Sequence, residues 1–120
     1  MYHKDLNAWK ESINLVKKVY TLTAEFPQTE QFGLISQIRR AAVSIPSNIA
    51  EGCGRNSDKE LIHFCRIAMG SLSEVETQIF IAKELGYLKE TTEIDMDIGK
   101  VRKLLSGFIN YIQNKPTCAK

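Results

Sequence analysis

The sequence between residues 92 and 114 carries the most regular hydrophobic pattern in the chain. Large apolar side chains recur at steps of four and three residues, which is the spacing of one buried stripe on an α-helix. The stripe consists of Ile94, Ile98, Val101, Leu105, Phe108 and Ile112. A helix with this pattern has to pack its stripe against other apolar surface, so the remaining segments decide the fold.

Three further segments share this helical period. Residues 6–23 have a predicted stripe of Leu6, Trp9, Ile13, Val16 and Tyr20. Residues 32–53 have a stripe of Leu34, Ile38, Ala41, Ile45, Ile49 and Gly52. Residues 58–85 have a stripe of Leu61, Phe64, Cys65, Ala68, Leu72, Val75, Ile79 and Ala82. Four amphipathic helices joined by short loops favour an all-α fold, an up-and-down antiparallel four-helix bundle.

Local signals predict where the helices end. Pro27 stops the first helix, because proline disfavours helical geometry in the residue before it. Pro46 lies inside the second, but the period continues in phase, so we predict one helix kinked at Pro46. Ser57 and Glu60 form a predicted capping box at the start of the third helix, and Gly86 is its predicted stop.

The composition is that of one ordinary globular domain. Of the 120 residues, 43% are hydrophobic and 25% are charged, which fits a single compact core. We predict one four-helix-bundle domain over residues 1–114 and a frayed C-terminal tail over 115–120. Three cysteines, with no signal peptide and no membrane-length apolar run, predict free thiols in a cytoplasmic protein with no membrane partner.

The third predicted helix carries more apolar surface than one bundle core can cover. Its stripe is flanked by Ile62, Met69 and Phe80 on one side and by Ile67, Ile81 and Leu85 on the other. Contiguous exposed apolar patches usually mark an interface. The sequence therefore predicts that the protein assembles with copies of itself.

The sequence contains no recognisable catalytic, phosphate-loop or metal-binding motif. His63 and Cys65 are two residues apart on a predicted helix and so point in different directions. Glu74 and Glu76 have the same unfavourable spacing for acid–base chemistry. We therefore predict a protein that is not an enzyme, with no catalytic residues, no metal and no cofactor.

One side of the second predicted helix gathers polar residues, namely Gln37, Ser44, Asn48, Glu51 and Arg55. They would face Ser71, Glu74 and Gln78 of the third helix, where Gly70 would let the two backbones approach closely. Two interpretations are open at this point. The first is a hydrogen-bonded network that fixes the packing of the two helices, and the second is a ligand or partner groove that uses Glu51 and Arg55.

The net charge of +2 is too small to indicate a polyanion partner by itself. Its distribution is more informative, because basic residues recur on three of the predicted helices. They are Lys10, Lys17, Lys18, Arg39, Arg40, Arg55, Lys100, Arg102 and Lys103. Self-association could align them into a stripe that contacts phosphates.

Several strings of residues resemble a known bacterial family. They are Phe32-Gly33-Leu34, Gln37-Ile38-Arg39-Arg40-Ala41-Ala42, Ser44-Ile45-Pro46-Ser47-Asn48-Ile49-Ala50-Glu51-Gly52, Arg55, and Ala68-x-Gly70-Ser71-x-x-Glu74. Together they resemble the four-helix-bundle proteins encoded in intervening sequences of 23S rRNA genes, and the resemblance extends from Trp9 to Tyr87. That family is similar to the accessory variability proteins of diversity-generating retroelements, which form basic pentameric barrels and bind nucleic acid together with a reverse transcriptase.

This resemblance implies a homopentamer with RNA or DNA as its leading partner and a reverse transcriptase as a candidate protein partner. Among the matching positions, we expect Arg39, Arg40 and Arg55 to contact nucleic acid. We expect a structural polar network of Gln37, Ser44, Asn48, Glu51, Ser71 and Glu74. The predicted function is a non-enzymatic, homo-oligomeric, nucleic-acid-binding bundle, and the alternative is a structural or protein–protein interaction module without nucleic-acid binding.

Overall fold

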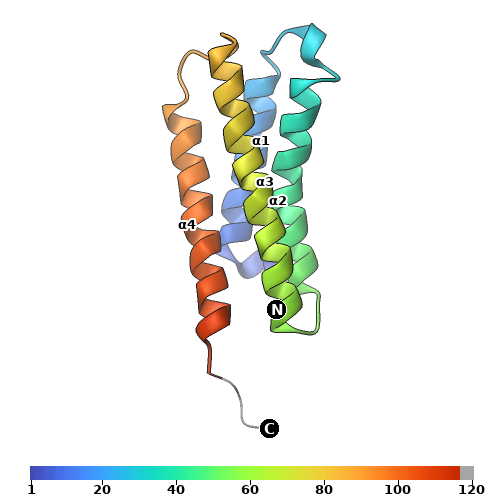
Figure 1. Ribbon diagram of the computed structural model, residues 1–120, viewed down its shortest axis with the longest axis vertical. Coiled ribbons are helices and arrows are strands. Elements are labelled where there is room, and N and C mark those ends of the chain that lie inside the picture. The colour runs from blue at the N-terminus through green and yellow to red at the C-terminus, as the bar shows by residue number, and fades with distance from the viewer. Residues whose placement is uncertain (117–120) are drawn as a thin grey trace.

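The chain folds into four α-helices that run alternately up and down (Figure 1). The structure is a computed structural model that describes residues 1–116. The helices are α1 (Asn7–Thr23), α2 (Leu34–Cys53), α3 (Asp58–Glu84) and α4 (Thr92–Asn114), with short 3-10 helices η1 (His3–Asp5) and η2 (Gln28–Glu30). No strand occurs in this range, and the predicted all-α bundle is confirmed.

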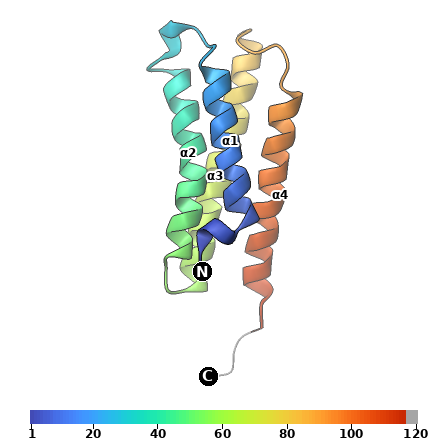
Figure 2. The same ribbon diagram turned by 180° about the vertical axis from the view of Figure 1, so that it is seen from behind.

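The four helices form a rod with dimensions of 57 × 25 × 20 Å. Each helix contacts two others, so that α1 lies between α2 and α4, and α3 also lies between α2 and α4, with α2 and α3 packed most closely. The α1–α2 and α3–α4 connections lie at one end of the rod, and the α2–α3 turn lies at the other (Figures 1 and 2). This arrangement gives four seams along the length of the rod, namely α1–α2, α2–α3, α3–α4 and α1–α4.

At the ends of α3 the predicted Gly86 stop and the Ser57 cap are confirmed, but only one of the two bonds of a capping box is present. The backbone N–H of Glu60 donates to the Ser57 hydroxyl over 3.1 Å, and that hydroxyl lies 3.3 Å from the Glu60 carboxylate. At the other end Gly86 has a φ of 83°. The N–H groups of Gly86 and Tyr87 donate to the carbonyls of Lys83 and Ala82, which is the Schellman pattern that glycine favours.

Helix α2 runs without interruption through Pro46, as predicted, and this proline is buried. A kink at that position stays a prediction. At the far end of the chain, Lys115 forms an ion pair with Asp58 over 3.3 Å. The rest of the predicted tail, residues 117–120, lies outside the described residues.

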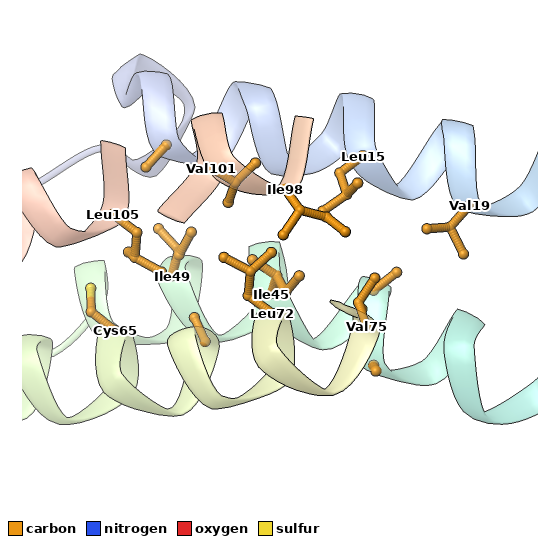
Figure 3. Packing of buried hydrophobic residues seen from close by; sticks show 14 of the residues in the cluster. Leu15, Val19, Ile45, Ile49, Cys65, Leu72, Val75, Ile98, Val101 and Leu105 are labelled. Atoms are coloured by element: carbon orange, nitrogen blue, oxygen red, sulfur yellow. The ribbon is translucent and has the colours of Figure 1, made fainter. Parts of the chain in front are cut away.

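The core is filled by side chains from all four helices. Leu15, Ile45, Leu72 and Ile98 converge in its middle (Figure 3). Most members of the predicted stripes of α2, α3 and α4 are buried. In α4 the structure buries Ile109 and leaves the predicted Phe108 partly exposed.

The stripe predicted for α1 is wrong. Its buried residues are Ala8, Ser12, Leu15, Val19 and Thr23. The predicted stripe lies on the neighbouring flank, where its members are only partly buried and Tyr20 is exposed. Ser12 and Thr23 can be buried because their hydroxyls donate to carbonyls of their own helix, each over 2.7 Å.

The glycine that lets α2 and α3 approach is Gly52 and not the predicted Gly70. A Cβ atom on Gly52 would lie 3.0 Å from the Cβ of Phe64 and 3.1 Å from the carbonyl oxygen of Leu61. A Cβ atom on Gly70 would meet nothing within 4 Å. The two helices therefore depend on the absence of a side chain at residue 52.

Replacing each glycine by alanine tests this difference. Gly70→Ala is expected to raise the free energy of unfolding by about 0.5–1 kcal/mol, because glycine weakens a helix interior. Gly52→Ala is expected to lower it by about 1–3 kcal/mol, because the methyl group overpacks the α2–α3 contact. Urea unfolding followed by circular dichroism measures both, and equal stability of the two variants would contradict the assignment.

Candidate interaction surfaces

Arg39 is engaged inside the protomer. Its Nε–H donates to the Thr23 hydroxyl over 2.8 Å, and its guanidinium lies 4.5 Å from the centre of the Tyr20 ring. These contacts join α2 to the C-terminal end of α1. The side chain is partly buried, so much of its hydrogen-bonding capacity is already used.

Arg55 is engaged as well, whereas Arg40 is not. The Arg55 guanidinium forms an ion pair with Glu51 over 2.8 Å and lies 4.9 Å from the centre of the Phe64 ring. Arg40 is exposed and forms no ion pair within residues 1–116. The structure therefore does not bring the three arginines together into one phosphate site.

The polar residues between α2 and α3 meet in a smaller group than the sequence suggests. The hydroxyls of Ser44 and Ser71 lie 2.9 Å apart, and the Asn48 amide donates to both the hydroxyl and the carbonyl of Ser44. Because the Ser44 hydroxyl already accepts from Asn48, it is free to donate to Ser71. All three residues are partly buried at the helix contact.

The other members expected in this network lie elsewhere. Gln37 is exposed, and Glu51 pairs with Arg55 of the α2–α3 turn. Glu74 accepts from the Gln78 amide over 3.2 Å along α3. The structure thus brings Ser44, Asn48 and Ser71 together and leaves Gln37, Glu51 and Glu74 outside the group.

A contact around Glu30 is absent from the sequence analysis. Its carboxylate accepts from the backbone N–H of Leu34 over 3.1 Å and from the Tyr87 hydroxyl over 2.8 Å. This hydrogen bond to a carboxylate raises the pKa of Tyr87. Glu30 therefore caps the start of α2 and ties it to the α3–α4 connection, a pairing across the chain that no local spacing could reveal.

Three of the other basic residues form ion pairs between helices. Lys18 contacts Asp97 over 2.5 Å and Glu93 over 3.0 Å, and the hydrogen bonds to these carboxylates raise its pKa. The other two pairs are Lys100 with Glu11 over 3.2 Å and Arg102 with Glu76 over 2.9 Å. Such exposed pairs add little stability, but they offset charges that could otherwise attract phosphate.

A polar groove of about 800 Å³ runs along the α3–α4 seam. We call it the α3–α4 groove. It is lined by Arg66, Met69, Gly99, Arg102, Lys103, Ser106, Gly107, Ile109, Asn110 and Gln113. None of these residues is acidic. The groove forms only where α3 and α4 lie side by side, so no local sequence pattern indicates it.

An apolar surface, which we call the α1–α2 strip, follows the seam between α1 and α2. It consists of two hollows that share Val43. One is lined by His3, Trp9, Ile13, Val16, Val43, Pro46, Ser47 and Ala50. The other is lined by Tyr20, Gln31, Phe32, Ile35, Ser36, Arg39, Arg40, Val43 and Ser44. Most of the stripe wrongly placed in the core thus lines this surface, and Phe32 is 90% exposed.

Part of the apolar surplus predicted for α3 lies on the surface, whereas Ile62 and Met69 are partly buried against the core. Ile67, Ile81 and Leu85 are exposed, and helical geometry places them on one side of α3 together with Glu74. We call these four residues the α3 face. Phe80, on a different side of the helix, is 63% exposed.

Comparison with known proteins places this bundle in a family. The model of the 23S rRNA-intervening sequence protein family matches residues 4–107. The chain belongs to this family. A crystal structure of a protein with unknown function from the S23 ribosomal protein family of Bacteroides thetaiotaomicron is similar in fold, with a TM-score of 0.77 and 22% sequence identity over 86% of this chain and 95% of that chain. No curated protein matches.

The titratable groups of this 23S rRNA-intervening sequence protein form no cluster that could hold a metal, as far as residues 1–116 are concerned. Over the same range, no helix is both long enough and apolar enough to cross a membrane. Cys53 and Cys65 are free and buried, and burial raises the pKa of Cys65 to about 11. A thiol in this setting is a poor nucleophile.

The burial of Cys53 and Cys65 can be tested by the rate at which their thiols react. In a Cys118→Ser variant, we expect Cys53 and Cys65 to resist an aromatic disulfide reagent at about pH 8, because burial both shields them and raises their pKa. Both should react at once after unfolding in urea. Rapid reaction of either thiol in the native protein would show that the site is open or that its thiol is activated.

Proposed function

We propose that this protein is a non-enzymatic subunit that assembles with copies of itself and that the assembly binds nucleic acid. The observation that carries the proposal is the presence of two uncovered apolar surfaces, the α1–α2 strip and the α3 face, on one small bundle. Full burial of one large apolar side chain is worth about 1.5–3 kcal/mol. Covering both surfaces therefore supplies a substantial driving force for assembly.

The charges on the two surfaces favour a contact between unlike faces. The lining of the α1–α2 strip includes Arg39 and Arg40 and no acidic residue. The α3 face carries the exposed carboxylate of Glu74, and no basic residue belongs to it. A strip on one copy that packs against the α3 face of the next gives a head-to-tail assembly, which closes into a ring when the rotation fits.

The closed state that we propose is the homopentamer, on the basis of the resemblance to the accessory variability proteins. Nucleic-acid binding is supported by that resemblance, by the exposed Arg40 and by the basic α3–α4 groove. A reverse transcriptase is the protein partner that the same resemblance suggests. No step of catalysis is part of the proposal.

The alternative is a structural or protein–protein interaction module without nucleic-acid binding. One observation favours it, namely that Arg39 and Arg55 are engaged within the protomer. Affinity capture from lysate, with and without nuclease treatment, separates the two functions. Partners that are retained after nuclease treatment, from a protein that binds no RNA or DNA, would favour the alternative.

Assembly through unlike faces can be tested by mixing two variants. Val43→Glu places a charge in the strip, and Leu85→Glu places one on the α3 face, so each variant alone is expected to be monomeric. Mixed together they should form a one-to-one dimer, because each keeps the surface that the other has lost. Light scattering measures the masses, with Met96→Glu, on the exposed side of α4, as the control that still assembles.

Two outcomes would contradict this part of the proposal. A wild-type protein that stays monomeric at high concentration would show that the apolar surfaces do not drive assembly. A Leu85→Glu variant that assembles like the wild type would show that the strip pairs with itself and that the α3 face takes no part.

Nucleic-acid binding is tested by electrophoretic shift with structured RNA and with DNA. We expect retention at low salt and a steep loss of affinity as salt increases, because displacement of counterions from phosphates drives such binding. Failure of the wild-type protein to retain either nucleic acid at low salt would refute this part and leave the interaction module.

A further inference from the structure

We infer that the α3–α4 groove binds the phosphodiester backbone of a nucleic-acid strand. The inference rests on the proposed function, and it names the surface that would perform it. That surface contains none of Arg39, Arg40 and Arg55, which the sequence suggests, and it lies along α4 from Gly99 to Gln113, orange to red in Figure 1.

The groove carries positive charge. Both of its walls are basic, with Arg66 on α3 and Arg102 and Lys103 on α4, and no acidic residue lines it. Glu76 offsets the charge of Arg102 over 2.9 Å, at the edge of the groove. Arg66 and Lys103 are exposed and form no ion pair with any residue that the structure describes.

The polar neutral residues of the lining fit the same ligand. Ser106, Asn110 and Gln113 follow one another along α4 and carry hydroxyl or amide groups that can donate to phosphate oxygens. Most hydrogen bonds between proteins and nucleic acids go to phosphate and sugar. The groove therefore combines free positive charge with neutral donors, and its lining contains no carboxylate, although Glu76 lies at its edge.

Two glycines leave open space along α4. Gly99 and Gly107 lie inside α4, where glycine costs about 1 kcal/mol relative to alanine. A Cβ atom at either position would meet nothing within 4 Å. Packing within the described chain therefore does not require glycine there, and the space above both residues is open to another molecule.

The dimensions suit an extended strand. From Gly99 to Gln113 the groove follows fourteen helical steps of α4, or about 21 Å. A strand advances about 3.4 Å per phosphate along the axis of a duplex and further per phosphate when it is extended, so at most about six phosphates span this length. No aromatic residue lines the groove, so bases have no stacking platform and little sequence preference is expected.

Charge reversal in the groove tests the inference. Binding of labelled single-stranded RNA and DNA would be measured by fluorescence anisotropy at several salt concentrations, for the wild type and for an Arg66→Glu/Lys103→Glu variant. We expect the variant to lose at least about tenfold in affinity. The slope of log affinity against log salt should become shallower by about 1.4 per occupied groove, or about 0.7 for each lost cation.

The matched control is Lys10→Glu/Lys89→Glu, which changes the net charge by the same amount. Both lysines are exposed, lie outside the groove and have no ion pair among residues 1–116. We expect a loss of affinity of about threefold or less, through the long-range field alone. Light scattering and thermal unfolding should show that all variants keep the fold and mass of the wild type.

A steric variant tests the groove without a change of charge. Gly99→Leu/Gly107→Leu fills the open space, whereas Gly70→Leu places the same side chain at an exposed glycine outside the groove. We expect the first to weaken binding several-fold at equal or higher thermal stability, because leucine favours a helix more than glycine does. The second should bind like the wild type.

The outcomes separate the inference from the proposed function. If the wild type binds RNA and both groove variants bind as tightly as their controls, the groove assignment is overturned and the proposed function stands. If the wild type binds no nucleic acid, both fail. Inorganic polyphosphate at equal phosphate concentration should compete with RNA, because the groove contacts phosphates. RNA that polyphosphate cannot displace would show that bases or sugars are recognised and would overturn the assignment to the backbone.

Discussion

The close packing of α2 against α3 is the constraint on which the rest of the bundle depends. The bare Cα of Gly52 lets the helices meet beside the α2–α3 turn, and the Ser44–Ser71 hydrogen bond holds them further along the rod. The helices pack less closely at the α1–α2 and α3–α4 seams. The apolar strip and the basic groove lie on these two less closely packed seams.

The sequence predicts the helices well because their signals are local. Pro27, the Ser57 cap and Gly86 act within one helical turn and mark the end of α1 and both ends of α3, and the hydrophobic period indicates the extent of the other helices. The buried side of α1 was assigned wrongly, because the assignment favoured the larger apolar side chains. Ser12 and Thr23 lie in the core since their hydroxyls bond to their own helix, and Trp9 and Val16 line the uncovered strip instead.

The candidate sites were harder to predict, because each depends on contacts between distant segments. Nothing near Arg39 in the sequence indicates that Thr23 and Tyr20 will engage it. The Glu30–Tyr87 hydrogen bond likewise joins residues that only the finished bundle brings together. In the sequence, Gly99 and Gly107 indicate only a less stable helix. The structure shows that they line a groove whose other wall is α3.

The net charge of +2 is therefore a poor guide to binding, because it sums pairs that cancel locally and charges that do not. Lys18, Lys100 and Arg102 face carboxylates, whereas Arg66 and Lys103 share a groove that has none. Two free cations give weak binding in one protomer. In a head-to-tail ring the α3 face would be covered. Arg66 lies about 100° around α3 from Ile67 of that face, so the α3–α4 groove of each copy could stay accessible. Repetition along one strand would then multiply a weak contact into useful affinity.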